Sequence, residues 1–378
     1  MDPSLQSSRL LVQAYTVCGR VQCAREGGTA MATDSGHDTY TRRDVLEQAA
    51  RLAGAVALPG TVARAAMPAV AREPRTALRH QVSRVALVRT DNRATGTRRA
   101  IDLLRPVGLA QRTVLLKPNY NTAGPAPAAT DTGLLEALVQ ELRVARAGPI
   151  TIGDRSGMAT TREAMAAKGV FALAKRYGLE VVAFDEMGAQ GWRYFAATGT
   201  HWQRGFAVAR PVLEAGAVVS TCCLKTHRFG GYFSLSLKNS VGMVAKYVPG
   251  DAHNYMAELH ASPYQRLMIA EMNRVYAPAL IVLDGVTAFV VGGPDLGTVA
   301  RPGVILAGTD RVAVDAVGVA LLRLLGTTPA VAAGSIWQLE QIRRAVELGL
   351  GVGSAAQIEL VTGDRASQRM ADQIRRLL

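Results

Sequence analysis

Long apolar runs are missing from this chain of 378 residues, although hydrophobic residues make up 49% of it. A helix that crosses a membrane needs roughly 18 or more apolar residues in succession, and no such run occurs. We therefore expect no membrane span in the mature chain. The apolar content instead indicates a globular protein with a large core, in one large domain or two ordinary ones.

Aromatic residues are also scarce, at 5% of the chain, although the formal net charge is +13. The basic residues are scattered along the sequence and form no stripe. Proteins that bind nucleic acids usually combine a basic stripe with aromatic side chains that stack on bases. We therefore expect no nucleic acid partner. The positive charge favours a small anionic molecule as the partner instead.

Cysteine occurs four times, and no two cysteines have the spacing of a CxxC motif. Such a set cannot supply a ferredoxin-like module, so we expect no iron–sulfur cluster. Cys18 and Cys23 fall in the amino-terminal region. Cys222 and Cys223 are adjacent, and a bridge between neighbours is strained. We interpret them as buried strand residues, with metal binding or redox chemistry as the alternative.

Several motifs of common α/β enzymes are missing as well. The chain has no GxGxxG after its first predicted strand, no GxxxxGK[ST] and no GxSxG. The sequence therefore does not support dinucleotide binding, P-loop nucleotide binding or a hydrolase with a nucleophile elbow.

Residues 1–66 are similar to an export leader of the twin-arginine type. Residues 41–46 read TRRDVL, a weakly apolar segment follows over residues 49–62, and the small residues of 63–66 suit a signal peptidase. Other arginine pairs occur by chance in this arginine-rich chain, but none has this context. We predict export to the periplasm or cell envelope, with the twin-arginine export machinery as a partner.

The start of the chain and the segment after the leader carry two further expectations. Met31 lies at a more usual distance from the arginine pair than Met1 does, so translation could begin there. Residues 67–82 are polar and rich in arginine, and we expect them to be a connector. The folded domain is expected over residues 83–378.

Within residues 83–378, short apolar segments alternate with amphipathic segments of helical period. The predicted strands are residues 85–88, 113–116, 150–153, 181–184, 217–221, 280–283, 304–308 and 358–361. Because these segments are apolar on both faces, they are typical of a parallel sheet covered by helices. We therefore predict an α/β fold with a mainly parallel sheet, in two lobes around a cleft.

Polar residues follow the predicted strands and gather in one loop. The residues at the strand ends are Lys117, Asn119, Asp154, Ser156, Lys225, His227, Asp284 and Asp310. The loop after Lys225 adds Lys238 and Asn239 and contains Gly230 and Gly231. Because the carboxyl ends of parallel strands share one edge of a sheet, we expect these side chains to converge.

Three kinds of chemistry are predicted for this constellation. The predicted catalytic residues are Lys225 and His227, with His227 handling protons. The residues predicted to bind the substrate are Lys117, Asn119, Ser156, Lys238 and Asn239. The residues predicted to bind a divalent metal are Asp154, Asp284 and Asp310.

Each prediction has a structural alternative. Asp310 could cap the helix that follows it, and Asp154 and Asp284 could serve only in turns. His227 could be a hydrogen-bonded loop residue. The lysines are harder to explain structurally, because only six of the 43 basic residues are lysine.

These residues carry a resemblance to a known family. The segments are Lys117-Pro118-Asn119, residues 153–157 (GDRSG), Lys225-Thr226-His227, residues 236–239 (SLKN) with Gly242, Asp284-Gly285, residues 308–310 (GTD) and residues 314–318 (VDAVG). In order and spacing they resemble DUF362, a family of α/β proteins of unknown function, over about residues 83–328.

Many members of that family carry a ferredoxin-like iron–sulfur module, which this chain lacks. The family is distantly similar to the nickel-dependent lactate racemase group. That resemblance implies a two-lobed α/β architecture with lysine and histidine in a cleft, and it implies no particular reaction. Two functions stay open: an exported enzyme that acts on a small anionic substrate with metal assistance, or a non-catalytic accessory protein that binds a ligand, metal or cofactor.

Overall fold

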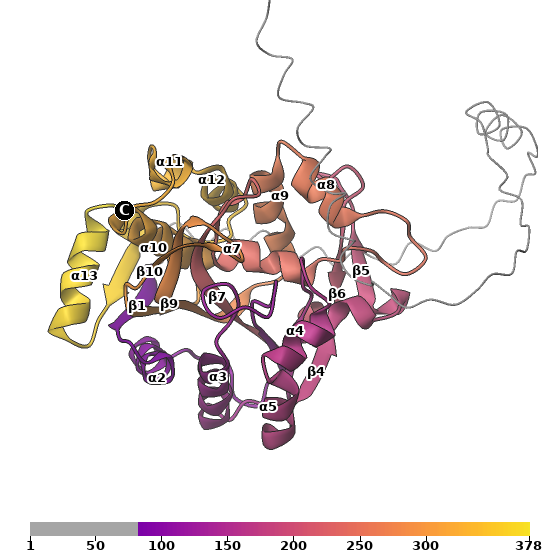
Figure 1. Ribbon diagram of the computed structural model, residues 1–378, viewed down its shortest axis with the longest axis horizontal. Helices are drawn as coiled ribbons and strands as arrows, with labels where there is room; N and C mark the ends of the chain where they lie inside the picture. The colour runs from indigo at the N-terminus through magenta and orange to yellow at the C-terminus, as the bar shows by residue number, and fades with distance from the viewer. Residues whose placement is uncertain (1–81) are drawn as a thin grey trace, which may run out of the picture. The chain divides into compact units, whose positions relative to one another are not determined.

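The computed structural model describes residues 82–378 (Figure 1). The predicted leader, residues 1–66, and the predicted connector up to residue 81 lie outside the described residues. In residues 82–378, no helix has the length and apolar character that crossing a membrane requires.

A ten-stranded sheet forms the centre of the domain, with the main strand order β12-β1-β11-β9-β7-β2-β3-β4. These strands are β1 (Ser83–Arg89), β2 (Val114–Lys117), β3 (Ile150–Asp154), β4 (Glu180–Ala183), β7 (Ala217–His227), β9 (Pro278–Gly292), β11 (Val304–Gly308) and β12 (Ile358–Val361). Two short strands complete the sheet: β8 (Tyr232–Ser234) pairs with β7, and β10 (Gly297–Ala300) pairs with β9.

The sheet is mainly parallel, as the sequence predicted. Strands β4, β3, β2, β7 and β9 run side by side in one direction, and β1 is parallel to β12. Strand β11 is the exception, because it is antiparallel to both β1 and β9. The carboxyl end of β11 therefore lies at the opposite edge of the sheet from the carboxyl ends of β2, β3 and β7.

Helices cover both faces of the sheet (Figure 1). One face carries α2 (Arg93–Leu104), α3 (Thr132–Val144), α4 (Thr161–Ala167) and α5 (Val170–Tyr177). The other face carries α6 (Arg210–Glu214), α7 (Ser236–Asn239), α8 (Tyr255–Ala261), α9 (Gln265–Glu271), α10 (Arg311–Leu324), α11 (Pro329–Ala332), α12 (Glu340–Glu347) and α13 (Arg365–Arg375).

Local sequence explains helix α3. The Asp131 side chain accepts a hydrogen bond from the Leu134 backbone N–H at 3.1 Å and so caps the first turn. Leu134, Leu138 and Leu142 recur at helical spacing and are buried against the sheet. The capped amphipathic helix predicted at this position is confirmed.

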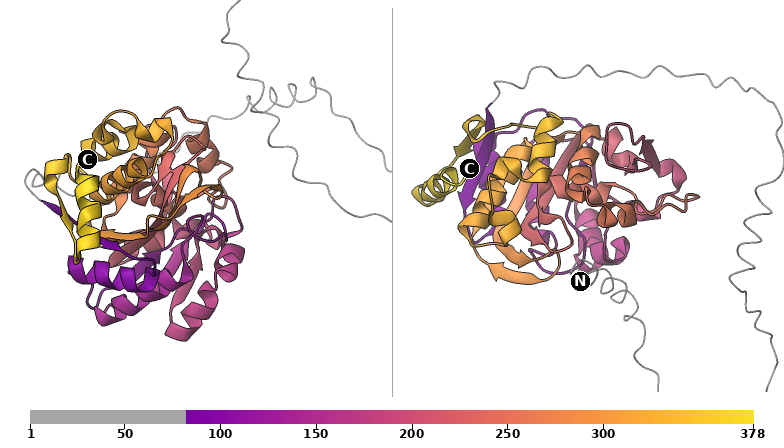
Figure 2. Two further views of the ribbon diagram at one scale, coloured as in Figure 1. Left: turned by 60° about the vertical axis from the view of Figure 1, so that its left-hand side comes forward. Right: turned by 90° about the horizontal axis from the view of Figure 1, so that it is seen from above.

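A small antiparallel sheet of β5 (Trp192–Phe195) and β6 (Phe206–Ala209) follows β4. It lies at the end of the domain farthest from α13 (Figure 2). Helices α8 and α9 lie between β8 and β9 in the chain. The described residues fall within one compact unit.

Candidate functional site

The ends of β2 and β3 bring a lysine and an aspartate together. Lys117 Nζ lies 2.7 Å from Asp154 Oδ1, and both side chains are buried. Lys117 Nζ also donates to the Pro118 carbonyl at 2.7 Å. Asp154 accepts backbone N–H bonds from Tyr120 at 2.8 Å and Arg155 at 2.7 Å.

This ion pair is closed to further partners. Burial lowers the pKa of Lys117 and raises the pKa of Asp154, while the attraction between the two charges acts the other way. A Cβ atom at Gly242 would lie 2.8 Å from Lys117 Nζ, so the chain packs directly on the pair. The structure therefore uses Lys117 and Asp154 to hold together the loops that follow β2 and β3.

The end of β7 joins this network through two asparagines. Lys225 Nζ donates to Asn119 Oδ1 and to the Ala128 carbonyl, each at 2.7 Å. Asn119 Nδ2 donates to Asn239 Oδ1 at 3.2 Å, and Asn239 Nδ2 donates to Ser220 Oγ at 2.9 Å. Burial lowers the pKa of Lys225, which forms no ion pair with any described residue.

Ser156 lies beside this network and is also engaged within the protein. Its hydroxyl donates to the Tyr120 carbonyl, and its backbone N–H donates to Thr161 Oγ1 at 2.8 Å. The predicted residues Lys117, Asn119, Ser156 and Asn239 thus meet at one edge of the sheet, as expected. Their polar atoms already have protein partners.

Helix α7 presents Lys238 at this edge and is held by a buried aspartate. Asp315 of α10 accepts hydrogen bonds from the backbone N–H groups of Ser236 at 2.7 Å and Leu237 at 3.0 Å. Burial raises the pKa of Asp315 to about 7. The carboxylate satisfies the first free N–H groups of a four-residue helix, and so it fixes the position of Lys238.

The side chains of Lys238 and His227 differ from those of the other residues at this edge, because they make no hydrogen bond or ion pair with any described residue. Lys238 is 7% exposed, and its amine makes no hydrogen bond or ion pair with any described residue. Burial and the nearby charges of Lys225 and Arg155 lower its pKa to about 7. His227 Nδ1 is buried without a hydrogen-bond partner. Burial and the Lys238 charge hold the pKa of His227 well below its usual value.

A glycine pair separates these two side chains from α9. A Cβ atom at Gly231 would lie 2.8 Å from Lys238 Cε and 3.2 Å from His227 Nδ1, so both side chains face this glycine. Gly230 has φ of +78°, where an L side chain is strained. Beside it lies Gln265, which is 2% exposed and whose Nε2 has no hydrogen-bond partner among the described residues.

We call His227, Gly230, Gly231, Lys238 and Gln265 the diglycine site. Its turn is anchored to α9, because Arg266 Nη1 donates to the Gly230 carbonyl at 2.8 Å. Gln265 was not among the residues predicted from the sequence. It is one polar residue in a short helix, and no local signal distinguishes it.

Two further basic side chains, one of Arg155 and one of His260, act electrostatically on the diglycine site. The Arg155 guanidinium donates to the carbonyls of Val244 at 2.7 Å and Ser156 at 2.9 Å and forms no ion pair with a described residue. His260 of α8 has Nδ1 2.7 Å from the Met256 carbonyl. Partial burial and the Lys238 charge lower the pKa of His260.

Asp284 does not join the constellation. It lies within β9 rather than at its end, and its side chain points toward helix α2. There Asp284 Oδ2 is 2.7 Å from Arg93 Nε, and Asp284 Oδ1 accepts the Val286 backbone N–H at 3.0 Å. The expectation that Asp284 ends a strand is not met, because β9 continues past it for another eight residues, and its carboxylate is paired with Arg93.

Asp310 is placed at the opposite edge of the sheet, because β11 is antiparallel to β9. It caps α10 by accepting the backbone N–H groups of Val312 at 2.8 Å and Ala313 at 3.0 Å. It also accepts from Ser83 Oγ and the Val352 N–H, each at 2.8 Å. The structural alternative given for Asp310 is therefore the one observed.

The predicted metal set of Asp154, Asp284 and Asp310 is thus divided among three places, each with its own partners. Across residues 82–378, no group of three or more histidine, cysteine or acidic side chains is arranged to hold a metal ion. Cys222 and Cys223 are free and buried in the middle of β7, and burial raises their pKa values. Their interpretation as buried strand residues is confirmed.

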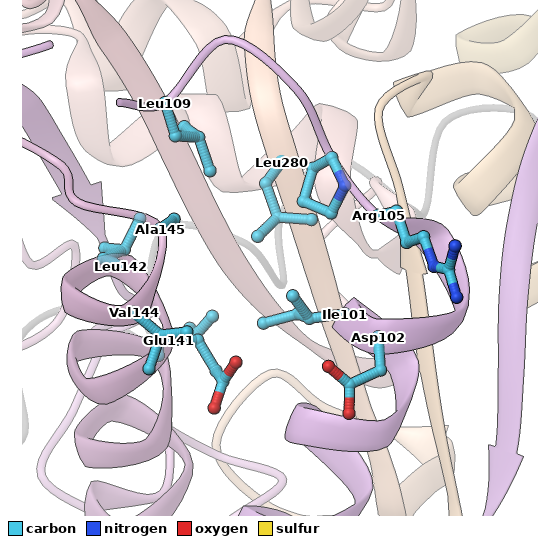
Figure 3. A pocket seen from close by; sticks show the side chains of 11 residues that line it. Ile101, Asp102, Arg105, Leu109, Glu141, Leu142, Val144, Ala145 and Leu280 are labelled. Carbon is cyan, nitrogen blue, oxygen red and sulfur yellow. The ribbon is translucent and has the colours of Figure 1, made fainter. Parts of the chain in front are cut away.

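A cavity of about 310 Å³ lies elsewhere, between the carboxyl ends of α2 and α3 (Figure 3). Its floor is apolar and includes Ile101, Leu138 and Leu280, and the carboxylates of Asp102 and Glu141 face each other across its mouth. Partial burial and the Asp102 charge raise the pKa of Glu141. This cavity shares no residue with the diglycine site.

Comparison with known proteins places the site within a matched region. The family described as Domain of unknown function (DUF362) matches residues 114–320, which include the whole diglycine site. No curated protein matches the chain.

Among solved structures, the lactate racemase apoprotein from Thermoanaerobacterium thermosaccharolyticum is similar, with 16% identity and a TM-score of 0.36. The match covers 61% of this chain and 54% of that one, so this chain spans about half the length of the racemase. A similarity this distant carries no argument about activity.

Proposed function

Because the family match spans more than half of its residues, this chain belongs to the DUF362 family, and we propose that it binds a small anionic molecule at the diglycine site. One observation supports this most directly. The Lys238 amine, His227 Nδ1 and Gln265 Nε2 have no hydrogen-bond partner among the described residues, and their side chains lie around one turn; of the three atoms, His227 Nδ1 and Gln265 Nε2 are fully buried.

Leaving such groups unpaired is unfavourable. A buried polar group without a partner costs about 1–3 kcal/mol, and a charged group costs more. Native proteins usually satisfy such groups, and exceptions point to function or to a bound ligand. The oxygen atoms of an anion bound at this turn would supply acceptors for the Lys238 amine and for Gln265 Nε2.

The electrostatic surroundings support the same conclusion. Lys225, Lys238 and Arg155 form no ion pair with a described residue, and the Asp154 carboxylate beside them is already paired with Lys117. The region therefore has more positive than negative charge in a poorly solvated environment, where charges interact strongly. An anion that binds there should raise the pKa of Lys238, because it stabilises the ammonium form.

We further propose that the site is catalytic and that His227 moves protons. Burial and neighbouring cations favour its neutral imidazole, and its Nδ1 has no competing partner, so it can accept a proton from a bound ligand. The three aspartates predicted to bind a metal are engaged elsewhere, so no step is assigned to a metal. The accessory function differs in one respect: the anion would bind without being turned over.

Export stays a separate proposal that depends on residues 41–66. The substitutions Arg42→Lys and Arg43→Lys together should retain the full-length chain inside the cytoplasm, whereas Arg98→Lys with Arg99→Lys should not. Cell fractionation followed by immunoblotting distinguishes the two. Equal export of both variants would contradict the proposal.

The anion site is tested by calorimetric titration of the full chain with oxalate, malonate and inorganic phosphate. At least one of these anions should bind, and Lys238→Met and Gln265→Leu should each weaken its binding at least tenfold. Lys175→Met, which replaces an exposed lysine of α5, should not. No binding by any of the three anions, or equal binding by all variants, would refute the proposal.

A further inference from the structure

Building on the proposed anion site, we propose that the Lys238 amine forms an imine with the carbonyl carbon of a small 2-oxo acid. The inference rests on a cluster of groups. The end of the Lys238 side chain, whose amine has no acceptor among the described residues, packs on the same glycine as His227 Nδ1, which has no partner there either. The charges of Lys225 and Arg155, which form no ion pair with a described residue, act on Lys238.

The position of Lys238 suits it to act as a nucleophile. An amine attacks a carbonyl only in its neutral form, and two conditions favour that form in proteins: removal from water and neighbouring positive charge. Lys238 meets both, because it is buried on α7 and lies near Lys225 and Arg155. Its pKa of about 7 means that much of the amine is neutral near pH 7.

Charge balance selects a 2-oxo acid over an uncharged carbonyl compound. A protonated imine keeps a positive charge at Lys238, which the surrounding cations disfavour. A carboxylate next to the carbonyl carbon would place a negative charge beside that iminium group and within the field of Lys225 and Arg155. A simple aldehyde or ketone lacks this compensation.

The step balances without a further reactant. Lys238 Nζ forms a bond to the carbonyl carbon, and the carbonyl oxygen becomes a hydroxyl in a carbinolamine. Loss of that hydroxyl with a proton from nitrogen releases one water molecule and leaves the C=N bond. His227 Nδ1 faces the same glycine as the end of Lys238 and has no other partner, so it is placed to carry protons between nitrogen and oxygen.

The closing experiment traps the imine by reduction. The full chain is incubated with pyruvate and sodium cyanoborohydride, which reduces a C=N bond to a stable secondary amine, and then digested for peptide mass spectrometry. We expect a carboxyethyl group on Lys238 and at least tenfold less on the exposed lysines Lys175 and Lys246. Propanal, which has no carboxylate, should modify Lys238 no faster than those two lysines.

The pH dependence separates this site from surface labelling. Trapping at Lys238 should increase with pH up to about 7 and then level off, since the amine is then neutral. Trapping at Lys175 should continue to rise toward the ordinary lysine pKa of about 10.4. Lys238→Met should abolish the adduct, while Lys175→Met should leave it unchanged.

Binding of oxalate distinguishes failure of the imine from failure of the anion site. Oxalate has two carboxylates and no ketone, so it reports on anion binding alone. If oxalate binds through Lys238 but pyruvate leaves no adduct there, the imine proposal is overturned and the anion site stands. An adduct spread evenly over the lysines would also overturn it. If neither oxalate binding nor an adduct depends on Lys238, both proposals fail.

Discussion

Replacing Lys238 with methionine should stabilise the protein. Methionine keeps the length of the side chain and removes the charge, so it can occupy the same buried path. The free energy of unfolding should increase near pH 7, because the folded protein no longer has to hold an amine whose ammonium form is disfavoured by burial and neighbouring cations. Replacement of a functional residue often stabilises a protein, because such a residue can lower the free energy of unfolding.

The magnitude follows from the pKa of Lys238, which falls from 10.5 to about 7 on folding. A tenfold change in a protonation equilibrium corresponds to about 1.4 kcal/mol, so the full effect is at most about 5 kcal/mol. Because the pKa of Lys238 is lower in the folded protein than in the unfolded chain, Lys238 destabilises the fold at low pH, and this cost disappears only above the unfolded pKa. The gain from Lys238→Met should therefore be greatest at pH 7 and below, and shrink to about 2 kcal/mol by about pH 9.

Urea denaturation of the full chain, followed by circular dichroism at pH 7 and pH 9, measures this effect. Lys175→Met is the matched control, because it removes an exposed lysine from helix α5 and should change stability by less than about 0.5 kcal/mol at either pH. The reasoning is refuted if Lys238→Met destabilises the protein at pH 7, or if its effect is the same at both pH values.

Three further predictions concern the groups that hold the site. Asp315→Asn should weaken oxalate binding, because the amide caps α7 less well than the carboxylate, and calorimetry would show this. Between about pH 4 and pH 7, Asp315 has lost its proton in the unfolded chain but keeps it in the folded protein, so the free energy of unfolding falls as the pH rises. Asp315→Asn should remove this fall, and an unchanged pH profile would contradict the prediction. Asp154→Asn should lower the free energy of unfolding by about 3–5 kcal/mol, because it leaves Lys117 without its counter-charge. The double variant Lys117→Met with Asp154→Leu should lower it less. Denaturation curves measure both effects, and a double variant whose loss equals the sum of the single losses would contradict a coupled pair. Gly231→Ala should reduce oxalate affinity with little loss of stability, because its Cβ would lie 2.8 Å from Lys238 Cε; unaltered affinity would show that Lys238 can move aside freely.

The sequence predicted most of the fold because its signals are local. Apolar segments such as residues 114–116 and 217–221 are buried on both faces, and this property alone indicates a parallel sheet covered by helices. Strand direction is not a local property. Nothing in residues 304–308 shows that β11 runs against β9, and the placement of Asp310 at the wrong edge followed from that.

The sequence predicted that Lys117, Lys225 and Lys238 lie at one edge of the sheet, but it could not separate the lysines with protein partners from the one without. Lys117 lies at a strand end and Lys238 in a glycine-containing loop, and the sequence predicts both as site residues. In the structure they differ because Lys117 pairs with a carboxylate and Lys238 does not. Asp154, which neutralises Lys117, comes from another strand. Gln265 comes from a helix after the site's own loop, so no spacing rule could reveal it.

These contacts give the residues at the sheet edge two different roles. Lys117, Asp154, Asn119 and Asn239 form a saturated network that fixes the loops after β2 and β3. Lys238 is placed beside that network by Asp315 and keeps its amine free. A network with satisfied hydrogen bonds beside one amine without a partner is the arrangement that a pre-organised site requires.

The most direct test of the anion site is the pKa of Lys238 measured by nuclear magnetic resonance with and without oxalate. Only six lysines occur in the chain, so ¹³C labels at lysine Cε give few signals, and Lys238→Met assigns the one of interest. We predict that this signal titrates near pH 7 in the free protein and that oxalate raises its titration midpoint by at least about one pH unit. A midpoint above about 10 in the free protein, or one that oxalate leaves unchanged, would contradict the account.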